Sequence, residues 1–585
     1  MAEKGSPVAK ALLICYRNAS PQPPAHRHLE LLSARILPDN IAPRPPHIVR
    51  TGQIVSAVFN PGAALRTDGA SFCLGVLSNP AADWATPRAP ASDGCYALFR
   101  TDRDRIELVA DAAATRTTWY VLTDQAFIAS TSQRAIVAAL GDFEPDREAC
   151  AWMLSSGSLG PECGWDTRLR RVPPGGRILL DRAAWQIARH EPRIDFAASE
   201  QEVAAEERQR RLQAAVDGVV RTLDVEYSRW FVPLSGGVDS RGLLLALRRG
   251  VPEGTKLRCV TWGRRSALEE PGNDACIART LAERLNVEHD FYAVEPSSEP
   301  RERLLERFLT AGEGRIGAIG GYLDGFDVWK SLYERGAEGV IRGDEAFGWK
   351  PVRSELDVRS SVRLTMLADF FDEERLSEFD LPEQRIPGEL MWRPQESIAT
   401  WRDRLYQQFR LPVMLAALTD LKTAYVDVLN PLLYSSVLEH ARALPDTLRT
   451  DKKLWRDTVR AFSPDVPFAK RSAVASLQAF MNDPAMLEWT LDELGSERAA
   501  RLLGKAPLAS VRAGMEAKLQ GQLAPTGAAP RSLSSRVARG LRRRAKKHLH
   551  GRFDLDPFVL AFRAVIASRM CALLHEDAAA LDELP

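Results

Sequence analysis

Residues 231–241 read FVPLSGGVDSR, and this stretch decides the class of fold. A short apolar run is followed at once by two hydroxyls, two glycines and a carboxylate, and the next residues, SRGLLLALRRG, have helical spacing. A short apolar run bounded by turn residues is typical of a buried strand. We therefore expect a strand, a tight turn and a helix, with the chemically active groups in the turn.

The turn has the composition of an anion-binding loop. Gly236 and Gly237 let the backbone approach a ligand closely, and the helix that follows presents its N-terminus to an anion. Ser235 and Ser240 add hydroxyl donors. Asp239 would repel a phosphate unless a cation lies between them, and magnesium binds phosphates together with one or two carboxylates. The alternative interpretation is a glycine–serine turn with an aspartate helix cap.

Length and composition limit the possible classes of protein. A chain of 585 residues is too long for one core, so we expect at least two domains. A formal net charge of +1 gives no reason to expect a nucleic-acid partner. The eight cysteines form no CxxC pair, which favours buried, reduced thiols. No signal peptide and no run of membrane-spanning length is recognised, so we expect a soluble, cytoplasmic protein with no membrane partner.

The pattern of apolar runs changes near residue 195. Residues 1–195 contain many short strand-like runs between turn residues, which predicts two packed sheets. From residue 196 to 585, strand-like runs such as KLRCVTW (256–262) first alternate with helical ones and then give way to mainly helical sequence. The alternation predicts a parallel sheet with crossover helices. We expect domains at 1–195 and 196–585, in α/β plus α+β architecture.

Several segments resemble those of one superfamily. SGGVDS (235–240) resembles the pyrophosphate loop of the ATP pyrophosphatase group. In family order, five segments resemble elements of glutamine-dependent asparagine synthetases: DGCYAL (93–98), RRVPPGG (170–176), VIRGDEAFGW (340–349), DVLNPLL (427–433) and DKKLWR (451–456). The resemblance implies an N-terminal Ntn-type, glutaminase-like β-sandwich and a C-terminal ATP pyrophosphatase-like α/β domain with additional helices.

The resemblance also implies roles for residues at the ATP site. Asp239 and Asp344 would be magnesium ligands, and Lys452, or Lys453 one residue along, would neutralise charge that develops near the α-phosphate. Lys452 is favoured, because its spacing to Arg456 matches the family element. For the lysines, the alternative is an exposed basic turn. ATP and Mg2+ are the implied cofactors, and the residues assigned to nucleotide binding are Leu234, Ser235, Gly236, Gly237, Asp239, Ser240, Trp262 and Gly343.

Two departures from the family pattern narrow the expected activity. Glutamine-dependent members need a cysteine directly after the initiator methionine, whereas this chain has Ala2, so the first domain would be a degenerate amidotransferase-like domain. Asparagine synthetases place a glutamate, and β-lactam synthetases a tyrosine, where this chain has Ile341, and Arg342 follows it. Arg342 faces anionic phosphates in one interpretation and closes a strand-end salt bridge in the other.

With these departures the chain resembles lasso peptide cyclases, which lack the N-terminal cysteine and use an amine already present on the substrate. The resemblance implies ATP-dependent macrolactam formation in a precursor peptide, through adenylation of an Asp or Glu side chain and attack by the N-terminal amine. A leader-binding protein and a leader protease are further implied partners. The alternatives are a β-lactam synthetase-like ligase of a small amino acid and a non-catalytic peptide-binding protein. The basic segment 531–552 would attract an acidic peptide or form a solvated helix face.

Overall fold

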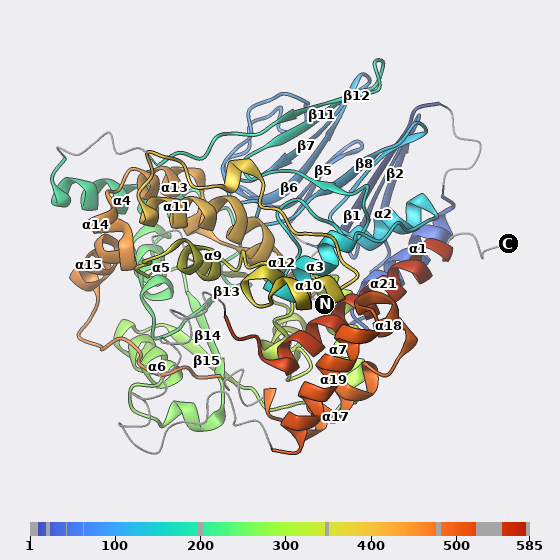
Figure 1. Cartoon of the computed structure of the whole chain (residues 1–585). Helices are drawn as coiled ribbons and strands as arrows, with labels where there is room; N and C mark the ends of the chain where they lie inside the picture. Colours follow the sequence, from blue (N-terminus) through green and yellow to red (C-terminus); the bar gives the residue numbers. More distant parts are fainter. Residues whose placement is uncertain are drawn as a thin grey trace.

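The computed structural model describes residues 10–18, 24–42, 44–62, 64–196, 203–344, 350–474, 481–521 and 553–580. These residues form a mixed α/β structure with two antiparallel sheets, one parallel sheet and many helices. In Figure 1 the antiparallel sheets stand together at the upper right, and the helices of the C-terminal part surround them below and to the left. Ala2, the predicted C-terminal basic segment and residues 345–349 of the VIRGDEAFGW element lie outside the described ranges.

The N-terminal part contains two six-stranded antiparallel sheets, as the short strand-like runs predict. Their strand orders are β10-β8-β9-β1-β3-β2 and β12-β11-β7-β6-β5-β4. The bounds are β1 Lys10–Tyr16, β2 His47–Thr51, β3 Ile54–Phe59, β4 Leu65–Asp68, β5 Ser71–Leu77, β6 Gly94–Thr101, β7 Arg105–Ala110, β8 Trp119–Leu122, β9 Ala126–Ser130, β10 Arg170–Arg171, β11 Arg177–Asp181 and β12 Gln186–His190. Leu13 and Phe127 of one sheet share a buried core with Phe72, Phe99 and Ile178 of the other, so the two sheets pack face to face.

Three helices in this part were not predicted from the sequence. They are α1 His26–Ile36, α2 Gln133–Leu140 and α3 Arg147–Ser156. Helices α2 and α3 have side-chain N-caps, Ser132 and Asp146, and each ends at a glycine in the left-handed region. These are ordinary start and stop signals for a helix, and they lie in a stretch where alternating strands dominate the pattern.

The C-terminal part contains the parallel sheet that the alternating pattern predicts. Its strand order is β15-β14-β13-β16-β17, and every neighbouring pair is parallel. The bounds are β13 Trp230–Pro233, β14 Arg258–Gly263, β15 Glu288–Ala293, β16 Gly339–Ile341 and β17 Asp427–Leu429. The chain runs outward from β13 to β15 and then returns to the other side of β13 at β16. The order therefore reverses between β13 and β16, and open α/β sheets bind ligands at such a point, beyond the carboxyl ends of the strands.

Helices surround this sheet and fill the rest of the C-terminal part. The α-helices are α4 Ala205–Arg221, α5 Val238–Gly250, α6 Asp274–Leu285, α7 Arg301–Gly312, α8 Asp327–Glu334, α9 Glu355–Val362, α10 Glu373–Glu378, α11 Ile398–Leu405, α12 Ala416–Thr423, α13 Ser435–Arg442, α14 Asp446–Arg449, α15 Lys453–Phe462, α17 Pro484–Glu493, α18 Glu497–Leu503, α19 Lys505–Leu519 and α21 Pro557–Ala579. A π-helix, η5 Tyr406–Leu415, joins α11 to α12, and the short turn η7 Thr450–Lys452 precedes α15.

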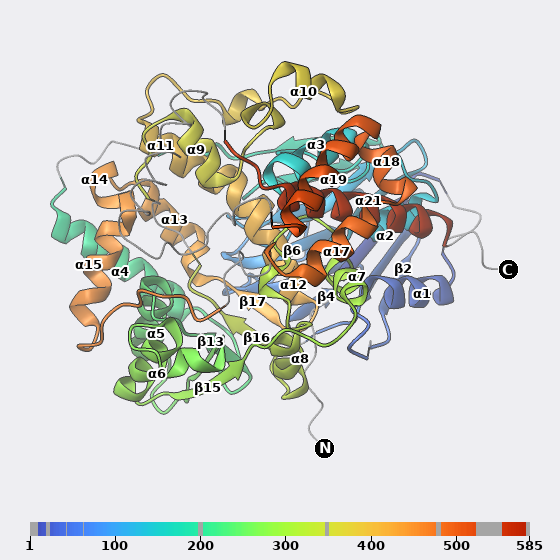
Figure 2. The same cartoon turned by 60° about the horizontal axis from the view of Figure 1, so that its bottom comes forward.

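Helix α21 corrects the expectation that no run reaches the length of a membrane span. By length and composition alone this helix, within the described residues, could cross a membrane. It packs against α2, α3, α17, α18 and α19, and Figure 2 shows it between these helices. Most of its apolar side chains, including Phe562, Ile566 and Met570, are buried in the same core as the N-terminal sheet. The apolar composition is explained by packing on all sides, as expected for a buried helix.

Buried ion pairs join the N-terminal sheets to the C-terminal part. The Lys10 ammonium lies 2.8 Å from the Glu313 carboxylate at the end of α7. The guanidinium of Arg116 pairs with Asp427 in β17, and that of Arg134 in α2 pairs with Asp577 in α21. Because each pair joins side chains that are far apart in sequence, the two parts are fixed to each other by specific charges as well as by apolar contact.

Candidate active site

A pocket of ≈ 530 Å³ opens at the carboxyl ends of β13 and β16, where the strand order reverses. One wall consists of the loops after these two strands, and the opposite wall consists of η5 and the start of α12. The lining residues are Pro233, Leu234, Ser235, Gly237, Val238, Asp239, Ser240, Thr261, Trp262, Asp274, Arg342, Gly343, Asp344, Tyr406, Arg410, Met414, Leu415, Leu418, Ser472, Ala473 and Val474. The pocket is large enough for a nucleotide or a drug-sized ligand.

The loop after β13 leaves the N-terminus of α5 facing the pocket. Gly237 is the N-cap residue of α5, and no side chain caps this helix, which excludes the interpretation of Asp239 as a helix cap. The hydroxyls of Ser235 and Ser240 lie 2.8 Å apart, and the Ser235 N–H donates to the Ser240 hydroxyl. A Cβ on Gly236 would lie 2.6 Å from the Ala469 Cβ, so only glycine fits there. The backbone N–H groups at the start of α5 thus remain directed at the pocket.

The Asp239 carboxylate has a partner on each oxygen. The Lys452 ammonium lies 2.5 Å from Oδ2, and the Trp455 indole N–H donates to Oδ1 over 3.1 Å. Both partners come from the DKKLWR segment at η7 and the start of α15, more than 200 residues along the chain. The fold therefore brings the DKKLWR segment to Asp239 at the start of α5.

Asp344 lies on the neighbouring loop, after β16, and pairs with Arg342. The guanidinium Nε of Arg342 lies 3.2 Å from Asp344 Oδ2. Burial would lower the pKa of Arg342, but the charge of Asp344 and its hydrogen bond more than offset this and raise the pKa. Gly343 brings the two loops together, because a Cβ there would lie 2.7 Å from the Asp239 carbonyl oxygen. The two predicted metal ligands thus face one pocket from adjacent loops.

The donor set fits a magnesium ion that arrives with phosphate. Within the described ranges no cluster of three or more His, Cys, Asp or Glu side chains could hold a metal by itself. Two carboxylates beside a helix N-terminus are sufficient for Mg2+, because this ion commonly takes one or two carboxylates and completes its shell with substrate phosphates and water. Asp239 and Asp344 would hold the ion, and the N–H groups of the loop would face the phosphates.

The pocket also contains groups that the sequence did not identify. Asp274, at the start of α6, accepts the Gly236 N–H over 2.8 Å, and burial raises the pKa of its carboxyl despite this hydrogen bond. Arg410 on η5 also lines the pocket, as do Met414 and Leu418, and its guanidinium lies 5.6 Å from the centre of the Tyr406 ring. The sequence motifs could not identify Asp274 and Arg410, because α6 and η5 lie outside the segments that contain those motifs.

A buried lysine lies next to the site. Lys422 of α12 is 7% exposed, donates to the Leu418 carbonyl oxygen and lies 5.7 Å from the centre of the Trp329 ring. Burial, with a further contribution from the positive charge of Arg342, holds the pKa of Lys422 well below its usual value. Trp329 in turn contacts Trp262 edge to face, so this lysine lies behind the pocket wall that carries Trp262.

The structure brings most of the predicted site residues together. Three of them are not among the residues that line the pocket. Gly236 packs against Ala469, Lys453 is exposed and pairs with Asp457 over 3.2 Å, and Lys452 contacts the lining residue Asp239. Of the adjacent lysines, the structure thus directs Lys452 and not Lys453 towards Asp239. Arg342 makes the strand-end salt bridge of one interpretation, and its partner is Asp344, the predicted metal ligand. Arg342 also lines the pocket, as the interpretation that it faces phosphates requires.

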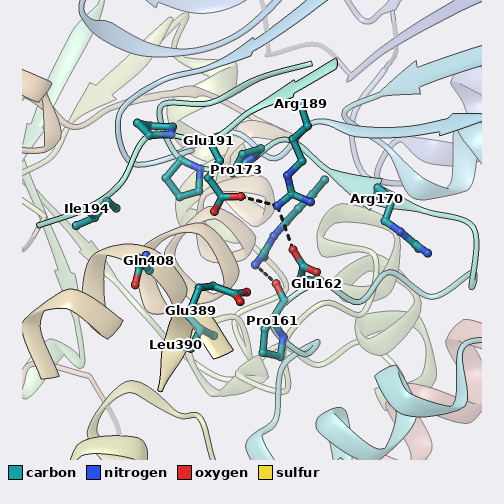
Figure 3. Close-up of a pocket in the computed structure, with 13 residues that line it drawn as sticks. Pro161, Glu162, Arg170, Pro173, Arg189, Glu191, Ile194, Glu389, Leu390 and Gln408 are labelled. Atoms are coloured by element: carbon teal, nitrogen blue, oxygen red, sulfur yellow. Dashed lines mark hydrogen bonds and ion pairs between the residues drawn. The ribbon is translucent and has the colours of Figure 1, made fainter. Parts of the chain in front are cut away.

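A second pocket, shown in Figure 3, contains the RRVPPGG segment. Arg189 points between Glu162 and Glu191, and the Arg171 guanidinium donates to the Pro161 carbonyl oxygen. Its volume is ≈ 40 Å³, and Glu389, Leu390 and Gln408 close it from the C-terminal part. A space of this size holds ordered water at most, so this segment serves as a junction between the two parts of the chain.

Comparison with known proteins gives little further guidance. No family model and no curated protein matches this chain. Among solved structures, glutamine phosphoribosylpyrophosphate amidotransferase from B. subtilis, complexed with ADP and GMP, is similar to it at 11% sequence identity. The match covers 58% of this chain and 83% of that chain, with a TM-score of 0.20. A likeness of this size does not establish a shared fold, so the function is inferred from the pocket and its side chains.

Proposed function

We propose that this chain is an ATP-dependent carbon–nitrogen ligase that releases AMP and pyrophosphate. The observation that carries the proposal is the convergence of Asp239, Asp344 and Lys452 at the anion-binding loop of one pocket. Two carboxylates from different loops are of no use to a protein that only binds a peptide. They are of use where a metal must be held against phosphates whose charge changes during a reaction.

The chemistry has two balanced steps. In the first, a substrate carboxylate oxygen attacks the α-phosphorus of ATP, the bond to the β-phosphate oxygen breaks, and pyrophosphate leaves. In the second, an amine nitrogen attacks the acyl carbon, AMP leaves, and the amine loses one proton. Bound magnesium would neutralise charge on the phosphates and the departing pyrophosphate. Lys452 would stabilise charge that develops near the α-phosphate, and the N–H groups at the start of α5 would orient the phosphates.

More finely, we propose that the product is the macrolactam of a lasso peptide. Ala2 replaces the cysteine that would release ammonia from glutamine, so the attacking amine must come from elsewhere. The N-terminal amine of the peptide itself meets this need, and one pocket that holds amine and activated carboxylate together supplies a high effective concentration. On this proposal the N-terminal part is a degenerate Ntn-type amidotransferase-like domain, and a leader-binding protein and a leader protease act with the enzyme in the cytoplasm.

The proposal is tested with the purified chain, MgATP and a candidate precursor peptide, taken from any short reading frame found beside its gene. We expect ATP–pyrophosphate exchange that depends on the peptide, and a product that has lost one water and resists linearisation by proteases at the ring. Exchange with a small amino acid in place of the peptide would favour a β-lactam synthetase-like ligase. No exchange with either substrate would leave a binding protein without ligase activity.

A further inference from the structure

Each predicted metal ligand is paired with a cation of the chain itself. Lys452 lies against Asp239 and Arg342 against Asp344. The side chains of the first pair are each 14% exposed, so the pair is shielded from water. Shielded pairs of opposite charge attract each other more strongly than surface pairs, because less water screens them. A metal ion therefore has to displace two cations before it can use these two carboxylates.

We infer that Lys452 and Arg342 keep free divalent metal out of this site and admit it only together with the nucleotide. The inference rests on the proposed function, because it takes Asp239 and Asp344 as the metal ligands. Incoming phosphate oxygens would attract Lys452 and Arg342 away from the two carboxylates, and Asp239 and Asp344 would then be available to hold the metal. Metal and nucleotide thus bind as a unit.

The charges at the pocket agree with this order. The pocket lining includes the carboxylates of Asp239, Asp274 and Asp344 and the guanidinium groups of Arg342 and Arg410, and Lys452 adds a third cation through its contact with Asp239. A divalent ion alone would add two positive charges to a balanced set. A metal–nucleotide complex brings its own negative charge, for which Lys452 and Arg342 are suitable partners.

The surroundings of Lys452 allow it to leave while Asp239 stays in place. Trp455 binds the other oxygen of Asp239, and a Cβ on Gly242 would lie 2.3 Å from the Trp455 ring, so the indole is fixed against α5. Lys452 itself lies in a turn where it and Asp451 both have φ of 56°, a left-handed conformation that is costly for residues other than glycine. A costly turn that directs one side chain at a ligand is consistent with a functional role for that side chain.

Binding of Mn2+ as a substitute for Mg2+, measured by electron paramagnetic resonance without nucleotide, tests the inference. Lys452→Met and Arg342→Met should each tighten Mn2+ binding by about tenfold or more over the wild type, since each frees one carboxylate from a pair worth several kT. Lys453→Met is the matched control, because that lysine pairs with Asp457 on the exposed side and should leave the affinity unchanged. Adding Asp239→Asn to Lys452→Met should abolish the gain.

The inference is overturned if neither Lys452→Met nor Arg342→Met tightens Mn2+ binding, or if Lys453→Met tightens it equally. Circular dichroism confirms that each variant is folded. If only one of Lys452→Met and Arg342→Met folds, the Mn2+ affinity of that variant decides the test. Failure of the ligase proposal looks different. If the wild type shows no ATP–pyrophosphate exchange but the two variants bind Mn2+ more tightly, the cations control metal entry in a protein with another activity. If exchange occurs and Mn2+ affinity is unchanged, only the control of metal entry is wrong.

Discussion

At the scale of single residues, Asp239 and Asp344 are the pocket carboxylates on which the proposed activity depends. Asp239→Asn and Asp344→Asn each remove one negative charge from the predicted magnesium site and preserve the shape of the side chain. We expect AMP formation to fall by a factor of 10³ or more in each, because a lost metal contact leaves several kcal/mol of phosphate charge uncompensated. The measurement is AMP release from MgATP and precursor peptide, with circular dichroism as the folding control. Near-normal AMP release in either variant would show that its carboxylate does not bind the metal.

Trp455 is a positioning residue for Asp239 and offers a finer test. Trp455→Phe keeps an aromatic ring against Gly242 and removes only the indole N–H that binds Asp239 Oδ1. A hydrogen bond to a charged group contributes about 1.5–3 kcal/mol, so we expect the KM for MgATP to rise by roughly 10- to 100-fold. Thermal unfolding should change little. A large loss of stability with an unchanged KM would instead indicate a purely structural role for Trp455.

At the scale of elements, the turn before α8 contains a buried carboxyl with an unusual pKa. Asp324 is 4% exposed and accepts the backbone N–H groups of Phe326 and Val328. Burial raises its pKa from 3.8 to about 6. The folded state therefore binds the proton more tightly than the unfolded state, so the cost of the buried charge is fully present above pH 6 and disappears below about pH 4.

We expect Asp324→Asn to stabilise the protein at pH 8 by roughly 1–3 kcal/mol, the upper figure being the full cost of the raised pKa. The gain should shrink as the pH falls through 6 and vanish near pH 4, where the native aspartate is already protonated. Urea unfolding of both proteins at pH 8, 6 and 4 measures this. A gain that does not depend on pH would mean that the charge of Asp324 is not its source.

Sequence patterns predicted the strands and helices whose apolar residues repeat at a regular spacing. They missed the π-helix, whose geometry depends on a single proline. The strands β13, β14 and β15 and helix α5 follow from short apolar runs and helical spacing, and the parallel order follows from their alternation. The π-helix η5 was not predicted. Pro412 lies inside it and has no N–H to donate, so the regular α-helical bond cannot form there, and a wider turn is stabilised by the buried surroundings.

The part of the candidate site that could be predicted consists of motif residues that closely follow predicted strands. Ser235 and Asp344 follow directly after strands, and Asp239 lies in the first turn of the helix after β13, where residue type and position both indicate ligand binding. Arg410 was not predictable, because an arginine in a helical stretch is usually on the surface and only the packing of η5 turns it to the pocket. Lys452 was favoured over Lys453 from the sequence, because its spacing to Arg456 matches the family element, and in the structure Lys452 is the lysine that contacts Asp239.

At the scale of the whole molecule, the N-terminal part should contribute stability but no glutamine chemistry. Since Ala2 has no thiol, glutamine should not support amide formation, and glutamate release in its presence should equal the background without enzyme. The check is glutamate measured over the time in which the peptide and MgATP give product. Glutamate above background would mean that another nucleophile acts on glutamine in this chain.

The attachment of this part to the rest of the chain depends on buried charges, of which the pair Lys10–Glu313 is the clearest. The Ser132 hydroxyl and the Gln133 N–H also donate to the Glu313 carboxylate. Burial acts to raise the pKa of this carboxyl, but Lys10 and these two hydrogen bonds lower it overall. The pair therefore stabilises the folded protein above the unfolded pKa of Glu313, and this contribution is lost as the pH falls through its lower folded pKa.

Lys10→Met leaves the buried Glu313 carboxylate without its cation and should cost about 3–5 kcal/mol at pH 8. The loss should shrink towards pH 4, because a protonated Glu313 no longer needs a cation. Lys10→Met combined with Glu313→Gln should recover most of the stability at pH 8, since both charges are then gone. Urea unfolding at the two pH values distinguishes the cases. If the double variant were as unstable as Lys10→Met alone, packing of the Lys10 side chain, and not its charge, would be what this pair contributes to joining the two parts.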